Sequence, residues 1–413
     1  MPYQMDRVIL RELAKEIAEI AALPVQEERR ALWRGLNGLR PERPMVMIDQ
    51  ICWNEMDRDG FLTPRCQGEE ARRYEERLRR TLFQWRHFPV DMVVEPFVAV
   101  PKAIRNTGYG LRKQEEILPG DRRGEVASHR YIDILQNDDD LQRITVPKMS
   151  HDAGETARRL DMAQDLFGGI LEARPEGAAP FMQLWDPIAE YKGVEGALYA
   201  LADDPEFVHR MVSRMMRSFT GMLDQLEEQG LLCETRLQTL IHCTGAYTDE
   251  LPAPGYDPVR PRCKDLWIAG LAQMFSSVSP AMHQEFELDY VNPIFERFGL
   301  VYYGCCDPLD RKLDIVTKIP NLRKVSMSPW TQAERAAEGL GRKFVFSSKP
   351  NPAFLAGISF DEDAVRSELV HIKSACNRHG CPLEFILKDI STVQYEPKRL
   401  FRWAEIAMEV ALS

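Results

Sequence analysis

Several short apolar runs of this sequence end in side chains that can do chemistry. The segment "YYGCCD", residues 302–307, places two adjacent cysteines and an aspartate directly after such a run. The residues placed in this way, in or directly after an apolar run, are Asp49, Glu95, His242, Cys243, Tyr303, Cys305, Cys306, Asp307, Lys349, Asn351, Lys388 and Asp389. In a barrel of parallel strands the reactive groups lie at the carboxyl ends of the strands, so these residues are expected to share one site.

Cysteine, histidine and carboxylate side chains at strand ends are the ligand types of a zinc site with an open coordination position. Cys306, His242 and Cys243 are the candidate metal ligands. Adjacent cysteines bind one tetrahedral ion only under strain, so a second interpretation stays open. In it, one cysteine packs into the barrel and the other lines a pocket as a thiol.

Aromatic residues that fall in or beside predicted strand-to-helix loops could form the wall of an aromatic substrate pocket. They are Trp53, Trp185, Trp267 and Phe275, and Asn351 is the polar residue expected to contact the same substrate. Ordinary packing of these aromatic rings in the core is the alternative.

The charge balance favours small molecules or protein partners over nucleic acid or an anionic membrane. The chain of 413 residues has 53 basic and 63 acidic side chains, a net charge of −10. Its nine cysteines are scattered without the regular spacing of a secreted disulfide scaffold. The first residues, "MPYQMDRVILRELAKEIAEI", interrupt their apolar pattern with charges, unlike a signal peptide, so a cytoplasmic enzyme with reduced thiols is expected.

Strand-like and helical patterns alternate along most of the chain. Strands are predicted at residues 45–49, 92–98, 181–185, 237–243, 299–304, 322–328, 343–348 and 383–389, with long helical patterns between them. This alternation predicts a parallel sheet covered by helices, and about eight units favour a (β/α)8 TIM barrel. An open doubly wound sheet is the alternative, although no G-x-G-x-x-G follows a strand. Residues 1–40 are expected to form a helical lead-in, and 41–413 one barrel domain with insertions around 107–180.

The order of several blocks resembles the uroporphyrinogen decarboxylase superfamily. These blocks are "RPERPMVMID", "WDPIAEYKGVEGALYALADDPEFV", "SPAMHQEFELDYVNPIFERFG", "YYGCCD", "SSKPNPAFLAG" and "FILKDISTVQYEPKRLFRWAEIA". They are most similar to its branch of corrinoid-dependent methyltransferases. The resemblance covers nearly the whole chain from about residue 27, and it implies a (β/α)8 barrel.

Two departures from the superfamily pattern reduce the number of activities that this resemblance implies. True decarboxylases carry an arginine-rich stretch after the first strand, but here no arginine follows that strand before Arg58, which disfavours porphyrinogen decarboxylation. The thiol-methylating members bind zinc through a His-x-Cys-Gly segment and a later cysteine. Here Gly304–Asp307 matches that segment only at Cys306, and Lys388 and Asp389 stand where the later cysteine would be.

The resemblance that remains is to the first methyltransferase of anaerobic O-demethylase systems. It implies transfer of a methyl group from an aryl methyl ether to the Co(I) of cobalamin carried by a separate corrinoid protein. Asp307, His242, Glu95 and Tyr303 are then the candidate acids or metal ligands, supported by Lys388 and Asp389. The loops at 107–180 and 245–265 are the expected docking surface.

Other activities within the same superfamily stay open at this point. The donor could be a methylamine, a methyl thiol or methanol-derived, or the acceptor could be a thiol such as coenzyme M. A barrel that only binds the corrinoid protein without turnover is the non-enzymatic alternative. The sequence leaves open whether zinc is bound and whether the chain is a monomer or a homodimer.

Overall fold

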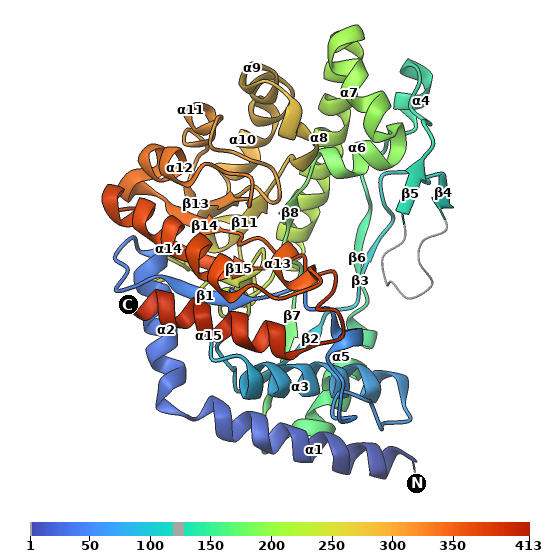
Figure 1. Ribbon diagram of the computed structural model, residues 1–413. Helices are drawn as coiled ribbons and strands as arrows, with labels where there is room; N and C mark the ends of the chain where they lie inside the picture. Colours follow the sequence, from blue (N-terminus) through green and yellow to red (C-terminus); the bar gives the residue numbers. More distant parts are fainter. Residues whose placement is uncertain (1, 119–127) are drawn as a thin grey trace.

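The computed structural model describes residues 2–118 and 128–413 and shows an α/β protein built on one parallel sheet (Figure 1). The sheet has seven strands in the order β1-β15-β14-β13-β12-β11-β8. Their bounds are β1 Met45–Ile48, β8 Phe181–Met182, β11 Trp267–Gly270, β12 Leu300–Tyr303, β13 Leu322–Met327, β14 Val345–Ser348 and β15 Leu383–Leu387. Every pairing between neighbours is parallel, which confirms the predicted α/β class with a parallel sheet.

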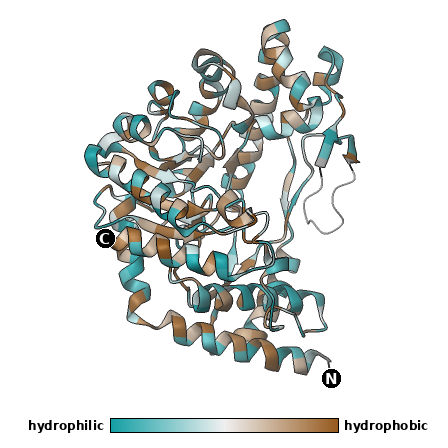
Figure 2. Ribbon diagram, in the orientation of Figure 1, coloured by the Kyte–Doolittle hydropathy of each residue, from teal (hydrophilic) through white to brown (hydrophobic). Residues whose placement is uncertain are grey.

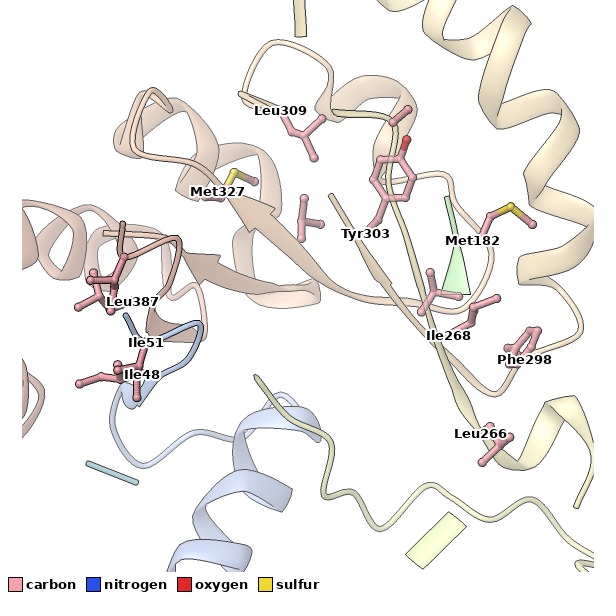
Figure 3. Close-up of a cluster of buried hydrophobic side chains, with 14 of the residues drawn as sticks. Ile48, Ile51, Met182, Leu266, Ile268, Phe298, Tyr303, Leu309, Met327 and Leu387 are labelled. Carbon is pink, nitrogen blue, oxygen red and sulfur yellow. The ribbon is translucent and has the colours of Figure 1, made fainter. Parts of the chain in front are cut away.

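The strands are buried on both faces, as expected for a parallel sheet whose crossover connections are helical. Alternate residues of each strand point to opposite faces. Tyr303 and Met327 belong to the face that packs with the helices, in a cluster that also contains Ile268 and Leu387 (Figure 3). The alternating positions lie on the opposite, inner face of the curved sheet. Those of β11 and β12, Tyr302 among them, belong to a separate apolar cluster.

Helices cover the outer face of the sheet, with hydrophobic residues on their inner stripes and hydrophilic residues outside (Figure 2). The α-helices of the described residues, those outside this layer included, are α1 Pro2–Ala21, α2 Pro24–Asn37, α3 Glu69–His87, α4 Asp138–Gln142, α5 Ala153–Phe167, α6 Trp185–Lys192, α7 Val194–Asp203, α8 Pro205–Glu228, α9 Pro280–His283, α10 Asp289–Phe295, α11 Leu313–Val316, α12 Ala333–Leu340, α13 Ala353–Ala356, α14 Glu362–His379 and α15 Lys398–Leu412. No helix in the described ranges is long and apolar enough to cross a membrane.

The first two helices occupy the predicted N-terminal lead-in. Pro24 is the first residue of α2, where the missing N–H of proline costs no hydrogen bond. The helix α1 lies outside the helical layer, against α3 and α5 (Figure 1). The division into a lead-in and one barrel domain stays a prediction, because α1 packs on helices of the larger unit.

The sheet does not close into the predicted eight-stranded barrel, since no ladder joins β1 to β2 (Phe97–Pro101) in residues 2–118 and 128–413. β2 pairs instead with β7 (Glu172–Glu176). The free edge of β1 is taken by Asp91, which accepts a hydrogen bond from the Val46 N–H (2.8 Å) and donates its own N–H to the Val46 carbonyl (2.9 Å). Arg43 pairs with both oxygens of the same carboxylate. These bonds occupy the positions that a closing ladder would need.

The prediction of a sheet strand at 237–243 is wrong. Only Leu240–Ile241 (β9) is extended, and it pairs antiparallel with Thr244–Gly245 (β10) in a two-residue hairpin. The turn residues His242 and Cys243 both have positive φ, 39° and 70°, the backbone that a tight hairpin turn requires. The missed strand β11 takes the place next to β8, so Trp267 lies within a strand and not in a loop.

The insertion region forms two small antiparallel pairs beside the sheet. β3 (Ile104–Asn106) pairs with β6 (Met149–His151), and β4 (Glu115–Leu118) pairs with β5 (Ser128–Tyr131). The prediction of insertions around 107–180 includes residues 119–127, which lie outside the described residues.

A buried ion pair ties the hairpin to the interior of the sheet. Lys324 of β13 and Glu384 of β15 are both fully buried, with Nζ and Oε2 2.7 Å apart. The Thr244 hydroxyl donates to the same carboxylate oxygen (2.8 Å), and Lys324 also donates to the Gly245 carbonyl (3.2 Å). The indole rings of Trp33 and Trp267 lie 5.2 and 5.9 Å from the ammonium. The hairpin therefore supplies hydrogen bonds that the buried charges need.

We expect Lys324→Met to lower the free energy of unfolding by about 3–5 kcal/mol, because it leaves the Glu384 carboxylate buried without its partner. Urea denaturation followed by circular dichroism measures this loss. The double variant Lys324→Met/Glu384→Leu should recover most of it, since both charges are then gone. Arg73→Met, which removes an exposed ion pair with Glu69, is the control. A Lys324→Met protein as stable as the wild type would contradict the structural role of the pair.

Candidate active site

A cavity of about 340 Å³ opens at the carboxyl ends of β12, β13, β14 and β15. Its lining residues come from the loops that follow these strands: Cys305, Cys306, Pro329, Trp330, Lys349, Pro350, Asn351, Pro352, Ala353, Ala356, Lys388, Asp389 and Ser391. Binding sites form at this end of a parallel α/β sheet. The structure therefore brings together six of the residues that the sequence predicted to share one site, namely Cys305, Cys306, Lys349, Asn351, Lys388 and Asp389.

The loop after β12 turns the two cysteines toward this cavity. Gly304 has a φ of 98°, and a Cβ there would lie 2.6 Å from the Leu309 side chain, so the bend requires glycine. The backbone of Cys305 is held on both sides. Its N–H donates to the Asp307 carboxylate (3.2 Å), and its carbonyl accepts from the Ser326 hydroxyl (2.8 Å). The position of the Cys305 thiol is therefore fixed by its loop.

Cys305, Cys306, Lys388 and Asp389 form a compact group of thiols and charges. The two sulfur atoms are 3.4 Å apart, and Lys388 Nζ lies 3.3 Å from Cys305 Sγ and 3.5 Å from Cys306 Sγ. Asp389 Oδ2 lies 2.8 Å from the same ammonium and 3.2 Å from Cys306 Sγ. Cys305 is buried and Cys306 is exposed, so the group reaches from the protein interior to solvent.

This arrangement stabilises the Cys305 thiolate. The pKa of Cys305 is lowered because the Cys306 thiol hydrogen-bonds to it and because His242 and the Lys388 ammonium lie beside it, although burial works against this. The pKa of Cys306 is raised by its hydrogen bond to Cys305 and by burial. Burial also works against the charge of Lys388, but Asp389 and the neighbouring thiols keep the pKa of its ammonium raised. In the resulting charge state the Cys305 thiolate is paired with the Lys388 ammonium.

The tip of the β9–β10 hairpin reaches this group from inside the sheet. The His242 ring stacks on Phe181 (5.5 Å between ring centroids) and makes a tilted contact with Tyr302 (5.2 Å). Its Nε2 is buried and has no hydrogen-bond partner in the described part of the chain. Two adjacent residues other than glycine with positive φ cost about 1–2 kcal/mol each. The structure thus holds a strained turn against the Cys305 thiolate.

Lys349 is the other ammonium on the cavity. It continues the inward-facing row of β14 after Val345 and Ser347, donates to the Ser347 hydroxyl (2.7 Å), and lies 5.3 Å from the ring of Tyr302. The side chain is 4% exposed, and no carboxylate within the described ranges forms an ion pair with it. Burial therefore lowers the pKa of Lys349 to about 8. An amine with this pKa can give or take a proton near neutral pH.

Asp186 adds a carboxyl group close enough to feel the charge of the Cys305 thiolate. Burial and the negative charge of Cys305 raise the pKa of Asp186 to about 6. The residue lies in the first turn of α6, after β8. A carboxylate there is usually interpreted as a helix-dipole contact, so the sequence carried no signal for this position.

Tyr303 and Asp307 lie behind the cavity floor and do not line it. Tyr303 is fully buried, and its hydroxyl lies 2.7 Å from His283 Nε2 and donates to Glu287 (3.1 Å). Asp307 is buried as well, and this burial raises its pKa. Because Asp307 contacts the Cys305 backbone, it positions the thiol from behind. Neither side chain lines the cavity, so the structure offers no substrate contact for the direct catalytic role that the sequence predicted for Tyr303 and Asp307.

Glu95 belongs to a different part of the molecule. β2 begins at Phe97, since Pro96 has no N–H for the ladder, so Glu95 lies before the strand and not at its carboxyl end. Its carboxylate accepts from Arg30 (3.0 Å) and from the Tyr247 hydroxyl (2.7 Å). Glu95 lines a second cavity that shares no lining residue with the first.

The predicted aromatic wall is not formed by the four rings named from the sequence. Trp53, Trp185, Trp267 and Phe275 all lie away from the cavity. Trp185 packs against Phe275 at 4.6 Å and donates to the Phe286 carbonyl, while Trp267 donates to Ala246. Ordinary packing accounts for them. Trp330, which is 75% exposed, is the aromatic residue at the cavity, and Asn351 lines it as expected.

The candidate metal ligands do not converge. The Cys306 thiol contacts Lys388 and Asp389. The Cys243 thiol lies instead beside the Asp49 carboxylate, and burial and this carboxylate raise its pKa. Across residues 2–118 and 128–413 no group of three or more His, Cys, Asp or Glu side chains is placed to hold a metal ion. The donor set present does not fit zinc, so no chemical step is assigned to zinc here.

Comparisons with known proteins agree with the fold. No protein-family model matches the chain, and no curated protein sequence matches it. A solved structure of a methyltransferase from Methanosarcina mazei is similar over 92% of this chain and 97% of that chain, with a TM-score of 0.52 and 12% sequence identity. At this identity the similarity establishes a shared fold.

We expect Cys305 to react with iodoacetamide at pH 6, where an ordinary thiol is almost entirely protonated. A Cys306→Ser background, which keeps a hydroxyl donor at that position, leaves Cys305 as the thiol of the pair that can be labelled. Adding Lys388→Met should slow labelling at pH 6 by about tenfold per unit by which the pKa rises. Peptide mass spectrometry measures the rate. Lys343→Met, at an exposed position, is the control, and equal rates in both lysine variants would contradict the ion pair.

Proposed function

We propose that this chain is a corrinoid-dependent methyltransferase that moves a methyl group from an aryl methyl ether to the Co(I) of a separate corrinoid protein. The observation that carries the proposal is the Lys349 ammonium, with its pKa of about 8, on a cavity at the carboxyl ends of the strands. The fold shared with a methyltransferase supports the reaction class. We also infer that the sheet is a (β/α)8 barrel opened between β1 and β2.

The reaction needs an acid more than it needs a base. The bond between the methyl carbon and the ether oxygen breaks, its electron pair stays on the oxygen, and the methyl group bonds to the cobalt supplied by the partner. The phenolate that leaves then takes a proton. Because a phenol has a pKa of about 10, transfer from an ammonium with a pKa of about 8 is downhill.

Lys349 and Lys388 are assigned different tasks by their surroundings. Lys388 is committed to the Cys305 thiolate and the Asp389 carboxylate, which hold its proton. Within the described residues the Ser347 hydroxyl is the one hydrogen-bond partner of the Lys349 ammonium, so its proton is available to the substrate. Trp330 and Pro350 offer apolar surface to the arene, and Asn351 offers an amide to its substituents.

The partner is a corrinoid protein that presents its cobalt at the open end of this cavity. The loops at 107–180 and 245–265 remain the proposed docking surface. A thiol acceptor of the coenzyme M type is not favoured, since the residues of the metal segment do not gather as zinc ligands. No observation favours a methylamine donor over the ether.

The test is anaerobic absorbance of a Co(I) corrinoid protein mixed with this protein and 2-methoxyphenol. Loss of the Co(I) spectrum together with release of catechol supports the proposal. Conversion with methylamines or with a thiol acceptor, and none with ethers, would replace it. Binding of the corrinoid protein without turnover of any donor would support the non-enzymatic alternative.

We expect Lys349→Met to lower the rate of methyl transfer from 2-methoxyphenol by about 10²–10⁴-fold, the usual contribution of a general acid. The loss should be smaller for 4-nitroanisole, whose phenolate leaves with less help from an acid. Lys318→Met, at an exposed position away from the cavity, is the control. Equal losses for both ethers would contradict the role of Lys349 as an acid.

The wild-type rate should also fall as the pH rises through about 8. Lys349 acts in its protonated form, which is present below its pKa and lost above it. A pH profile of kcat/KM measures this. A rate that stays constant from pH 7 to pH 9.5 would contradict the assignment.

A further inference from the structure

A second cavity, of about 410 Å³, lies at the place where the sheet fails to close. It is bounded by α3, by the segment that leads into β2, by the end of β7 and by the base of the β9–β10 hairpin. We call it the seam cavity. It shares no lining residue with the candidate active site. The base of the hairpin, including Gly245, lines the seam cavity, while its tip lies beside Cys305, which lines the other cavity.

The helix α3 turns an unusually polar face toward the seam cavity. Tyr74, Arg77, Thr81 and Gln84 follow one another at spacings of three or four residues, so they lie along one stripe of the helix. The apolar stripe of α3, with Leu78 and Leu82, packs into the core beside them. The four polar side chains therefore lie on the flank of the helix and make this side of the cavity wall polar.

The seam cavity also contains opposite charges that do not pair. Burial raises the pKa of the Glu176 carboxyl, and the charge of Arg77 is close enough to work in the other direction. Yet neither side chain forms an ion pair or a side-chain hydrogen bond with any described residue. Glu95, on the same cavity, is already neutralised by Arg30. The lining thus has one unused anion and one unused cation.

Much of the rest of the wall is apolar, although Gln238, Thr239 and Tyr247 also line it. Met92, Val98, Leu237 and the rings of Trp33 and Phe97 line it. Its volume falls in the range of small-molecule sites, about 300–1,000 Å³. A ligand for this space needs an apolar body together with a head group that satisfies both charges.

We infer that the seam cavity binds a small zwitterion with an apolar side chain, of the α-amino-acid type, whose ammonium pairs with Glu176 and whose carboxylate pairs with Arg77. Glu176 is half-buried whereas Arg77 is exposed, so a ligand without an ammonium group would lose its pair with the less solvated of the two charges, and a ligand without a carboxylate would lose its contact with Arg77. The inference does not rest on the proposed methyl transfer, because none of its residues belongs to the candidate active site.

The test uses the full chain, with L-phenylalanine and L-leucine as probes in isothermal titration calorimetry. Their single-charge analogues, 3-phenylpropionate and 2-phenylethylamine, are titrated in parallel. We expect at least one amino acid to bind and both analogues to bind about tenfold more weakly or worse. Glu176→Gln and Arg77→Met should each weaken amino-acid binding by about tenfold or more.

Matched controls separate this site from general effects of charge. Glu172→Gln changes an exposed carboxylate on the same strand, and Arg73→Met changes an exposed guanidinium on the same helix. Both should bind as the wild type does, and so should Lys349→Met, which alters the other cavity. Absence of binding by both amino acids, equal binding by a single-charge analogue, or unchanged binding by Glu176→Gln would each overturn the inference.

Discussion

The buried ion pair between Lys324 and Glu384 is the interaction on which the rest of the interior depends. Two charges removed from water need further hydrogen bonds besides their mutual attraction. Part of that requirement is met by Thr244 and Gly245, which belong to the hairpin and not to the sheet. The ion pair therefore fixes the base of the hairpin. The strained tip, His242 and Cys243, is held beside the Cys305 thiolate as a consequence.

The same desolvation gives three interior lysines three different roles. Lys324 has a carboxylate at 2.7 Å and serves the structure. Lys388 has a carboxylate and a thiolate, which keep its ammonium charged. Lys349 has only a hydroxyl, so burial lowers its pKa to about 8. One physical effect, burial, meets a directly paired counter-charge in two cases and only the more distant charge of Glu384 in the third, and this difference distinguishes the residue that can exchange a proton.

The sequence predicted the strands that carry reactive side chains at their carboxyl ends far better than it predicted the roles of those side chains. Apolar runs identified β12, β14 and β15, and the cavity lies at their carboxyl ends, with Cys306, Asn351, Lys388 and Asp389 on it as expected. The run at 237–243 has the same composition but is a hairpin, because its turn residues adopt positive φ. Local pattern cannot reveal this, since the hairpin is stabilised by partners on distant strands. For the same reason Asp307 was predicted to face the substrate, whereas the bend at Gly304 places it behind Cys305.

The missing ladder between β1 and β2 and the hairpin inside the sheet are related features. A closed barrel of parallel strands fills its centre with layers of side chains from alternate strands. Here the β9–β10 hairpin lies in that centre, with Ile241 and Ala246 in the same apolar cluster as the inward-facing Ala269 and Tyr302. A backbone hairpin needs more room than side chains do, and the missing ladder between β1 and β2, where Asp91 occupies the strand edge, provides that room. The two cavities share no lining residue, and the hairpin contacts both regions, with Leu240 and Gly245 on the seam cavity and His242 beside Cys305 of the other.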